Sequence, residues 1–245
     1  MRILKKFGCL PEQMQNSAVL EYYTALRKKM FWLFLKRIFD IFVSVLFICV
    51  LLPLFLVVAA AIKLDSFGSI IYKQSRITQY GRKFKIYKFR TMVEKADTLG
   101  TLVTVGNDPR ITRVGKVLRK YRIDEIPQLF NILLGDMSFV GTRPEVEKYV
   151  NCYTDKMLAT LLLPAGVTSL ASIYYKDESQ LLAQTENVDE TYVQKILPAK
   201  MKYNLQYIEN FSLWNDLKIM VKTVFAVCAN KKIDLPENRK ADVNA

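Results

Sequence analysis

The chain has 245 residues, 51% of them apolar and 24% charged, with a mean hydropathy of +0.10, which predicts a membrane segment joined to one charged globular domain. Its net charge of +13 favours anionic partners: nucleic acid, anionic lipid headgroups or a phosphorylated substrate. The absence of histidine excludes a Ser-His-Asp triad, an imidazole base and a His-ligated zinc site.

Residues 1–30 form an N-terminal extension of mixed composition. Tyr22, Tyr23, Leu26 and Met30 recur at helical spacing, which predicts an amphipathic or packing helix. We expect no chemistry in this segment.

Residues 41–62 form a run of 22 residues without a charge, and we assign residues 31–62 to a membrane anchor. As a straight helix the run would be about 33 Å long, enough to cross a hydrocarbon core. The small residues at its end resemble a signal-peptide cleavage site. A cleaved signal is disfavoured because the run is too long and some forty residues precede it.

Two arrangements of the anchor remain open from the residues alone. A single spanning helix is the simplest, but Pro53 lies near the middle, where it removes a backbone hydrogen bond and favours a kink. Basic residues flank the run on both sides, which the positive-inside rule favours when both ends face the cytoplasm. Such a helix would enter the membrane, break near Pro53 and return. The flanking basic residues are Arg27, Lys28, Lys29, Lys36 and Arg37 before the run and Lys63, Lys73 and Arg76 after it.

Residues 63–230 are predicted to form a mixed α/β, helix-rich domain. The pattern predicts short strands at 69–74 and 84–89, helices at 112–121 and 125–134, and a mostly helical segment at 181–208 interrupted by Pro198. A last helix at about 213–228 carries an apolar stripe, for which packing on the core is favoured over the membrane interface. The tail at 231–245 is polar. The stripe consists of Trp214, Leu217, Val221, Val224, Phe225 and Cys228.

The four cysteines are scattered, with no CxxC pair. This pattern predicts free thiols in a reducing compartment.

Basic residues are concentrated in residues 73–122, which contain fourteen Lys or Arg against three Asp or Glu. Such a block could be a solvated face or a patch that binds anionic lipid, worth about 1 kcal/mol per residue. It could also bind nucleic acid. That reading is disfavoured because the aromatic residues fall at strand-core spacing and no recognition helix is apparent.

Asp124 and Glu125 follow this block directly and precede Pro127. Because proline is tolerated in the first helical turn, a helix is predicted to begin at Asp124 or Glu125, and Asp124 alone could be only its N-cap. An acidic pair among arginines is also what phosphoryl chemistry needs. One carboxylate attacks phosphorus, the other holds a divalent cation, and arginines balance the phosphate charge.

The order of several motifs resembles the bacterial sugar transferases, the small monotopic phosphoglycosyl transferases that start surface glycan assembly. The similarity covers roughly residues 33–227. The matching segments are KRIFD at 36–40, KFRTM at 88–92, DPRIT at 108–112, LRK at 118–120, DEIPQL at 124–129, NIL at 131–133, GDMSFVG at 135–141, RP at 143–144 and PAGVT at 164–168.

The resemblance implies a re-entrant membrane helix with a catalytic domain facing the cytoplasm, in the bacterial inner membrane. It implies a ping-pong reaction with Mg²⁺, in which Asp124 attacks the sugar-linked phosphate of a UDP-sugar and releases UMP. Polyprenyl phosphate then takes the phosphosugar from the aspartyl intermediate. Glu125 matches the magnesium-associated glutamate, and Arg143 and Pro144 match a phosphate-contacting element.

Further substrate or phosphate contacts are expected from Arg90 and Arg119 within the matching motifs, and from Lys176. The chain departs from the family at three points. Thr142 stands where a proline is usual, Leu52 precedes Pro53 where a serine is typical, and Lys176 falls near an arginine position. Lysine supplies charge without the bidentate fork of arginine.

Two other classes of function compete with this reading. A membrane-anchored nucleic-acid- or lipid-binding protein without catalysis would also explain the basic block, and so would an inactive scaffold related to the enzymes. The expected partners are a UDP-sugar, polyprenyl phosphate and anionic membrane lipids, with no nucleic acid. The sugar, the pathway served and the choice between monomer and homo-oligomer stay open.

Overall fold

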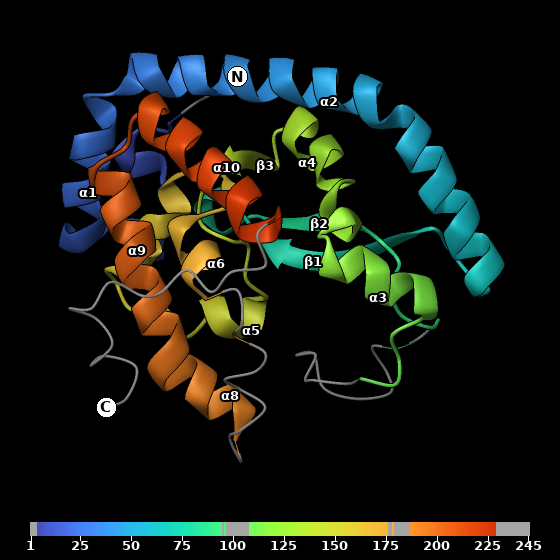
Figure 1. The fold of residues 1–245 in the computed structure, drawn as a ribbon. Helices are drawn as coiled ribbons and strands as arrows, with labels where there is room; N and C mark the ends of the chain where they lie inside the picture. The colour runs from blue at the N-terminus through green and yellow to red at the C-terminus, as the bar shows by residue number, and fades with distance from the viewer. Residues whose placement is uncertain (1–3, 95, 97–107, 176–177, 179–186, 229–245) are drawn as a thin grey trace.

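The structure is a computed structural model that describes residues 4–94, 96, 108–175, 178 and 187–228 (Figure 1). Its described part is a mixed, helix-rich α/β fold, as predicted, and two small sheets lie among its helices. The longer helices are α1 (Ser17–Arg27), α2 (Met30–Asp65), α3 (Arg113–Lys120), α4 (Gln128–Leu134), α9 (Leu197–Glu209) and α10 (Leu213–Cys228). The short helical elements are η1 (Phe7–Cys9), η2 (Glu12–Met14), η3 (Gln79–Gly81), η5 (Ile123–Glu125), α5 (Glu147–Val150), η6 (Met157–Leu162), α6 (Leu170–Tyr174), α8 (Val188–Thr191) and η7 (Tyr192–Ile196).

The N-terminal extension packs on the domain through α1. The Asn16 side chain accepts a hydrogen bond of 2.8 Å from the Val19 amide and so caps the helix. Tyr22, Tyr23 and Leu26 are buried on one face. The predicted packing helix is confirmed.

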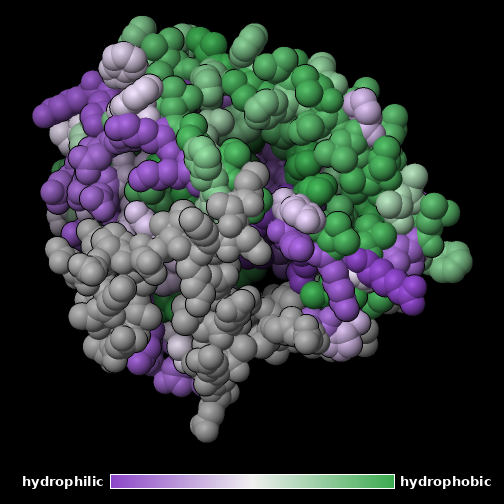
Figure 2. Space-filling view, viewed as in Figure 1, coloured by the Kyte–Doolittle hydropathy of each residue, from purple (hydrophilic) through white to green (hydrophobic). Residues whose placement is uncertain are grey.

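The apolar run forms the middle of α2, a single helix of 36 residues that contains Pro53. In length and composition α2 could cross a membrane, yet only 11% of its most apolar window is buried inside the protein. Figure 1 shows it running along one side of the molecule and then bending around the edge. Apolar side chains cover this arc in Figure 2, so α2 carries a large unpartnered apolar surface.

The first half of α2 is attached to the domain by polar side chains. Lys36 and Asp216 of α10 form an ion pair of 2.5 Å, and their side chains are only 7% and 5% exposed. One helical turn later, the Phe139 amide donates to Asp40 at 3.2 Å. Arg37 donates to the two carbonyl groups of Ile132 and Leu133 near the end of α4.

The second half of α2 contacts the same domain. Val58 and Ile62 are buried in a cluster with Phe89 and Leu118. The Asp65 carboxylate at the end of α2 accepts a hydrogen bond of 3.0 Å from the Val114 amide in α3. Both ends of the apolar helix therefore lie against one globular domain.

The first sheet pairs β1 (Ile71–Ile77) with β2 (Lys83–Phe89) in antiparallel register. Both strands were predicted, with boundaries shifted by up to three residues. The second sheet pairs β3 (Met137–Val140) with β4 (Ala165–Thr168) in parallel. It was not predicted, because these four-residue strands lie within motifs that read as glycine-rich turns.

The segment around Asp124 differs from the prediction. Residues Ile123–Glu125 form the 3₁₀ turn η5, and α4 begins only at Gln128, with Pro127 at its N-cap. Pro127 has no N–H to donate to Ile123, so a continuous α-helix is disfavoured here. The Ile126 amide instead donates to the Ile123 carbonyl at 3.1 Å, in the tighter 3₁₀ pattern. Asp124 is therefore not an N-cap.

The C-terminal helices also show two differences. Pro198 lies in the first turn of α9 and does not interrupt the helical path, because the π-helical η7 precedes it. Residues 181–186 of the predicted helical segment, and the polar tail from 231, lie outside the described residues.

The apolar stripe on α10 does not pack on the core. Trp214, Leu217, Val221, Val224 and Phe225 are exposed, whereas Asp216, Ile219 and Ala226 are buried. The Asp216 carboxylate binds Lys36 and also accepts from the Tyr207 hydroxyl, which fixes the rotation of the helix. The side chain of Cys228 is not described.

Breaking the ion pair between Lys36 and Asp216 should detach α2. We expect Lys36→Met to lower the free energy of unfolding in detergent by about 3–5 kcal/mol, because it leaves a buried carboxylate without its cation. The double variant Lys36→Met/Asp216→Leu should recover most of this loss. Lys83→Met, which breaks an exposed pair with Glu147, is the matched control and should cost less than about 1 kcal/mol. A double variant as unstable as the single one would contradict this assignment.

Candidate active site

The Glu125 carboxylate lies among three cationic side chains from three parts of the chain. Its Oε1 oxygen is 2.6 Å from the Arg143 guanidinium, 3.1 Å from Lys88 Nζ and 3.7 Å from Arg122. Lys88 comes from β2, Arg122 precedes η5, and Arg143 follows β3. The site therefore depends on the tertiary fold.

These cations keep Glu125 ionised. Burial opposes the charged carboxylate, but Arg143, Lys88 and Arg122 together outweigh it and hold the pKa of Glu125 well below its usual range. Burial also lowers the pKa of Lys88, against the attraction of Glu125. The pKa of Arg143 is raised by Glu125.

Asp124 has a different environment from its neighbour. It is buried, and its Oδ1 oxygen has no hydrogen-bond partner among the described residues. Burial, and then the charge of Glu125, raise the pKa of Asp124, while Lys88 and the nearby arginines act in the opposite direction. One carboxylate of the pair is therefore bound by cations, whereas the other has a buried oxygen without a partner among the described residues.

Local backbone conformation positions both sides of the site. Arg122 adopts the left-handed region at φ 57°, which turns the chain into η5. On the other side, Gly141 and Gly166 lie so close that a Cβ on Gly166 would come within 2.2 Å of the Gly141 nitrogen. Gly166 also donates to the Thr142 carbonyl at 2.8 Å. This close approach of two backbones holds the loop that carries Arg143.

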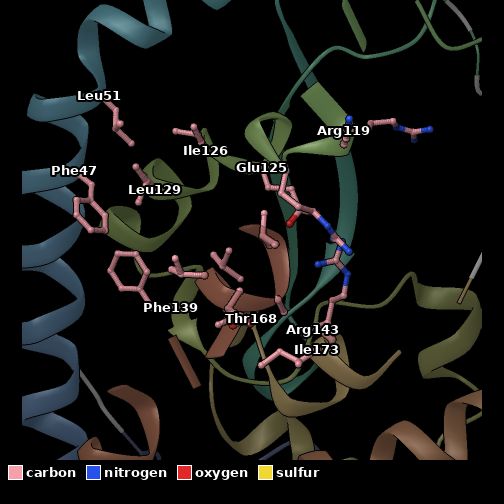
Figure 3. Close-up of a pocket in the computed structure, with 18 residues that line it drawn as sticks. Phe47, Leu51, Arg119, Glu125, Ile126, Leu129, Phe139, Arg143, Thr168 and Ile173 are labelled. Atoms are coloured by element: carbon pink, nitrogen blue, oxygen red, sulfur yellow. Dashed lines mark hydrogen bonds and ion pairs between the residues drawn. The ribbon is translucent and has the colours of Figure 1, made fainter. Parts of the chain in front are cut away.

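A cavity of about 550 Å³ opens beside Glu125. Figure 3 shows Glu125 and Arg143 pointing toward one another on one side of it, and Phe47 and Leu51 of α2 on the other. Phe47 meets Phe139 edge to face, with ring centroids 6.2 Å apart. The cavity is therefore charged at one end and apolar where it meets the exposed surface of α2. Arg119, Lys120 and Arg122 also line the charged end.

The structure gathers most of the predicted site residues but not all. Asp124, Glu125, Arg119 and Arg143 lie together, and Pro144 lines a second cavity next to Arg143. Arg90 is buried elsewhere, and its guanidinium donates to the carbonyls of Ser66 and Phe67 just after α2. It lines neither cavity. Lys176 lies outside the described residues.

Two contributing residues were not singled out as site residues from the sequence: Lys88 and Arg122. The alternation of side chains along β2 could have indicated Lys88, because Lys88 lies on the same strand face as the buried Phe84 and Ile86. A lysine on the core side of a strand needs a buried counter-charge. Arg122 is one of the basic residues that precede the acidic pair in the sequence, but its approach to Glu125 follows from its left-handed backbone conformation.

The carboxylates of Glu125 and Asp124 are the oxygen donors near which a divalent cation could bind. The three ion pairs of Glu125 all use Oε1, and none of them uses Oε2. Asp124 adds an oxygen without a partner. No group of three or more metal-ligating residues occurs in the described chain. Two carboxylates suit Mg²⁺, which is commonly bound by one or two carboxylates together with substrate phosphates.

Comparison with known proteins identifies one family. The family described as "Bacterial sugar transferase" matches residues 31–230. One relative is the UDP-N-acetylgalactosamine-undecaprenyl-phosphate N-acetylgalactosaminephosphotransferase of Aeromonas hydrophila. The two chains are 37% identical over 194 residues, and the match covers 78% of this chain and 43% of that protein. This chain is also 37% identical over 201 residues to the UDP-glucose:undecaprenyl-phosphate glucose-1-phosphate transferase of Klebsiella pneumoniae, covering 80% of this chain and 40% of that protein.

A third relative has a length closer to that of this chain. The exopolysaccharide production protein ExoY of Rhizobium meliloti is 35% identical over 211 residues, covering 80% of this chain and 86% of that protein. The chain spans less than half the length of the first two relatives.

Removing the Arg143 guanidinium should make stability depend less on pH. The pKa of Glu125 is lower in the folded state than in the unfolded state, so its ionised form adds stability above about pH 4.5 that is lost as the pH falls. We expect Arg143→Met to lower the free energy of unfolding by about 3 kcal/mol at pH 7, with a gap from wild type that narrows between about pH 5 and pH 3. Denaturant unfolding in detergent over this range measures it.

Arg82→Met is the matched control, because Arg82 pairs with Asp136 but its side chain is 54% exposed. It should cost less than about 1 kcal/mol. A gap between wild type and Arg143→Met that stays constant with pH would contradict the coupling to Glu125.

Proposed function

This chain belongs to the bacterial sugar transferase family, and we propose that it is a phosphoglycosyl transferase that moves a sugar-1-phosphate from a UDP-sugar to undecaprenyl phosphate and releases UMP. The observation that carries the proposal is the unequal carboxylate pair. Glu125 is held by Arg143, Lys88 and Arg122, whereas the buried Asp124 keeps an unpartnered oxygen. The names of the relatives supply the substrate class, and exopolysaccharide synthesis fits the third of them.

Asp124 is the nucleophile in this proposal. Its carboxylate oxygen attacks the sugar-linked phosphorus of the UDP-sugar, the bond from that phosphorus to the bridging oxygen breaks, and UMP leaves with the electron pair. An oxygen of undecaprenyl phosphate then attacks the same phosphorus and releases Asp124. The products are undecaprenyl diphosphate sugar and the regenerated carboxylate. A raised pKa supports this role, because a more basic carboxylate is the better nucleophile once ionised.

The cations around the pair have a matching role. Arg119, Arg122 and Lys120 line the charged end of the 550 Å³ cavity, where they would balance the charge of the phosphates. Arg143, which lines the same cavity, would do so as well, with Pro144 beside it in the chain. Lys176 stays a proposed phosphate contact.

Glu125 is the residue that would hold Mg²⁺, because its three ion pairs among the described residues all use Oε1. When bound, the ion would neutralise charge on the diphosphate. Keeping Glu125 ionised, which the surrounding cations do, prepares this carboxylate as a ligand.

The apolar end of the cavity suits the lipid substrate. Phe47 and Leu51 of α2 and Val224 of α10 line it, next to the exposed apolar surface of the anchor. A polyprenyl chain could lie along these residues in the membrane while its phosphate reaches Arg119 and Arg122. One cavity thus joins a lipid environment to a cationic site.

We assign α2 to a re-entrant anchor in the bacterial inner membrane, with residues 63–230 as the catalytic domain on the cytoplasmic side. A spanning helix would carry its two ends to opposite faces of a hydrocarbon core about 30 Å thick. Here Lys36 near one end and Asp65 at the other both bond to one domain. That geometry favours a helix that enters and leaves on the same side, with anionic lipids near its basic flanks.

Binding of nucleic acid or lipid without catalysis is less well supported. Three members of the basic block, Lys88, Arg119 and Arg122, surround a buried acidic pair instead of forming an exposed face. An inactive scaffold would not need to keep this arrangement.

Replacing Asp124 tests the mechanism. In membranes or nanodiscs with labelled UDP-sugars and undecaprenyl phosphate, Asp124→Asn should lower UMP release at least about 10³-fold, because an amide cannot act as the nucleophile. The exposed Asp155→Asn is the matched control and should keep the wild-type rate. UMP release at full rate from Asp124→Asn would show that the mechanism is wrong.

Single cysteines test the anchor. Three native cysteines, Cys9, Cys49 and Cys152, are exposed free thiols, so all four are first replaced by serine. Phe31→Cys then places an exposed thiol in the first turn of α2, and Phe67→Cys places one two residues after the end of the helix. With an impermeant maleimide we expect both to react in inverted membrane vesicles and neither in intact spheroplasts. Reaction of the two from opposite sides would establish a spanning helix instead.

A further inference from the structure

A second cavity shares Arg143 with the first. Its volume is about 190 Å³, and its walls come from β1, β2, α4, α5, η7, α9 and the loop after β3. Arg143 lines both cavities, while none of the described residues of α2 or α10 lines the second one. The second cavity therefore reaches two of the cations that bind Glu125, Lys88 and Arg143, away from the apolar surface.

Gln128 is an unused donor in the wall of this cavity. It is the first residue of α4, only 1% exposed, and its side-chain nitrogen has no hydrogen-bond partner among the described residues. A buried amide group without a partner costs about 1–3 kcal/mol. A ligand oxygen that accepted a hydrogen bond from Gln128 would therefore be favoured. Gln128 also lies three residues after Glu125, where η5 leads into α4.

A network of charged and hydroxyl groups forms the opposite wall. Lys200 donates to Glu178 at 3.0 Å and to the Tyr192 hydroxyl at 2.9 Å, and Tyr192 donates to Glu145 at 2.6 Å. Burial disfavours charge on Lys200, but Glu145 and Glu178 outweigh it and raise the pKa of Lys200. The wall therefore presents fixed acceptors and donors that are held by one another and do not need to reorganise.

Two tyrosine rings complete the cavity. Tyr149 and Tyr192 lie with ring centroids 4.4 Å apart, and both line it. Paired donors and acceptors next to an aromatic surface suit a small polyhydroxylated ligand better than an alkyl chain. The first cavity has an apolar end, which suits an alkyl chain better.

The order of the two displacement steps indicates which part of the substrates this second cavity would bind. Two successive in-line displacements at one phosphorus require the second acceptor to arrive where the first leaving group departed. UMP and undecaprenyl phosphate therefore use the same side in turn, which is the first cavity. The sugar remains bonded to the phosphorus during both steps and needs a place outside that path.

We propose that the second cavity holds the sugar of the UDP-sugar and selects it through Gln128 and the network of Glu178, Lys200, Tyr192 and Glu145. The inference rests on the proposed function and deepens it by naming the specificity site. A site built to hydrogen-bond sugar hydroxyls discriminates strongly against a sugar that leaves those groups unpaired. Selection therefore occurs away from the membrane surface.

The test compares kcat/KM for UMP release from UDP-glucose, UDP-galactose and UDP-N-acetylgalactosamine, with full-length protein in nanodiscs. We expect wild type to prefer one sugar, and Gln128→Leu and Glu178→Gln to reduce that preference about 10-fold or more. Glu178 is partly exposed, so its variant keeps the fold if Gln128→Leu does not. Inhibition by UMP, which lacks the sugar, should change less than about twofold in both variants.

Gln194→Leu is the matched control, because Gln194 is exposed on η7 and bonds only to Glu190 among the hydrogen bonds described for it. It should retain the wild-type preference. The inference would be overturned by variants that keep the wild-type preference, by variants that weaken UMP inhibition to the same extent, or by a wild type that treats the three sugars alike. Wild type that releases no UMP from any UDP-sugar would overturn the proposed function as well.

Discussion

The buried carboxylate of Glu125 is the interaction on which the site depends. An ionised carboxylate inside the protein would cost free energy if it stood alone. The charge of Glu125 is stabilised because Arg143, Lys88 and Arg122 approach it. These cations come from β2, the turn before η5 and the loop after β3, so one charge ties three segments together. The same arrangement leaves Asp124 with a raised pKa and an oxygen without a partner. Adjacent residues of similar chemistry are thereby given different environments.

The two cavities extend this asymmetry to the two substrates that we propose. One runs from the cationic residues to Phe47 and Leu51 of the anchor, and the other lies among polar side chains next to Gln128. Arg143 forms part of both. A lipid phosphate and a nucleotide-sugar differ most in the polarity of the group far from phosphorus. The two cavities that share Arg143 differ in the same way, since the first has an apolar end and the second is lined mostly by polar side chains.

The anchor shows how a sequence feature can have two meanings. Lys36 and Arg37 look like the cationic flank of a membrane segment, and the positive-inside rule treats them so. In the structure Lys36 binds Asp216, and Arg37 binds the carbonyls that end α4. Polar residues at the start of an apolar helix thus dock it to the domain. The same ion pair fixes the rotation of α10 and exposes Trp214 and its neighbouring apolar side chains.

The sequence by itself determined the features that depend on local order and periodicity. These include the apolar segment of α2, strands β1 and β2, helices α1, α3 and α10, the family, and the identity of Asp124 and Glu125 as the acidic pair. Only the tertiary structure decided which cations meet that pair, that Arg90 lies elsewhere, and that β3 pairs with β4. It also decided which face of α10 is buried. Such features depend on distant backbones and charges coming together, as when Gly141 meets Gly166, and no window of sequence contains both partners.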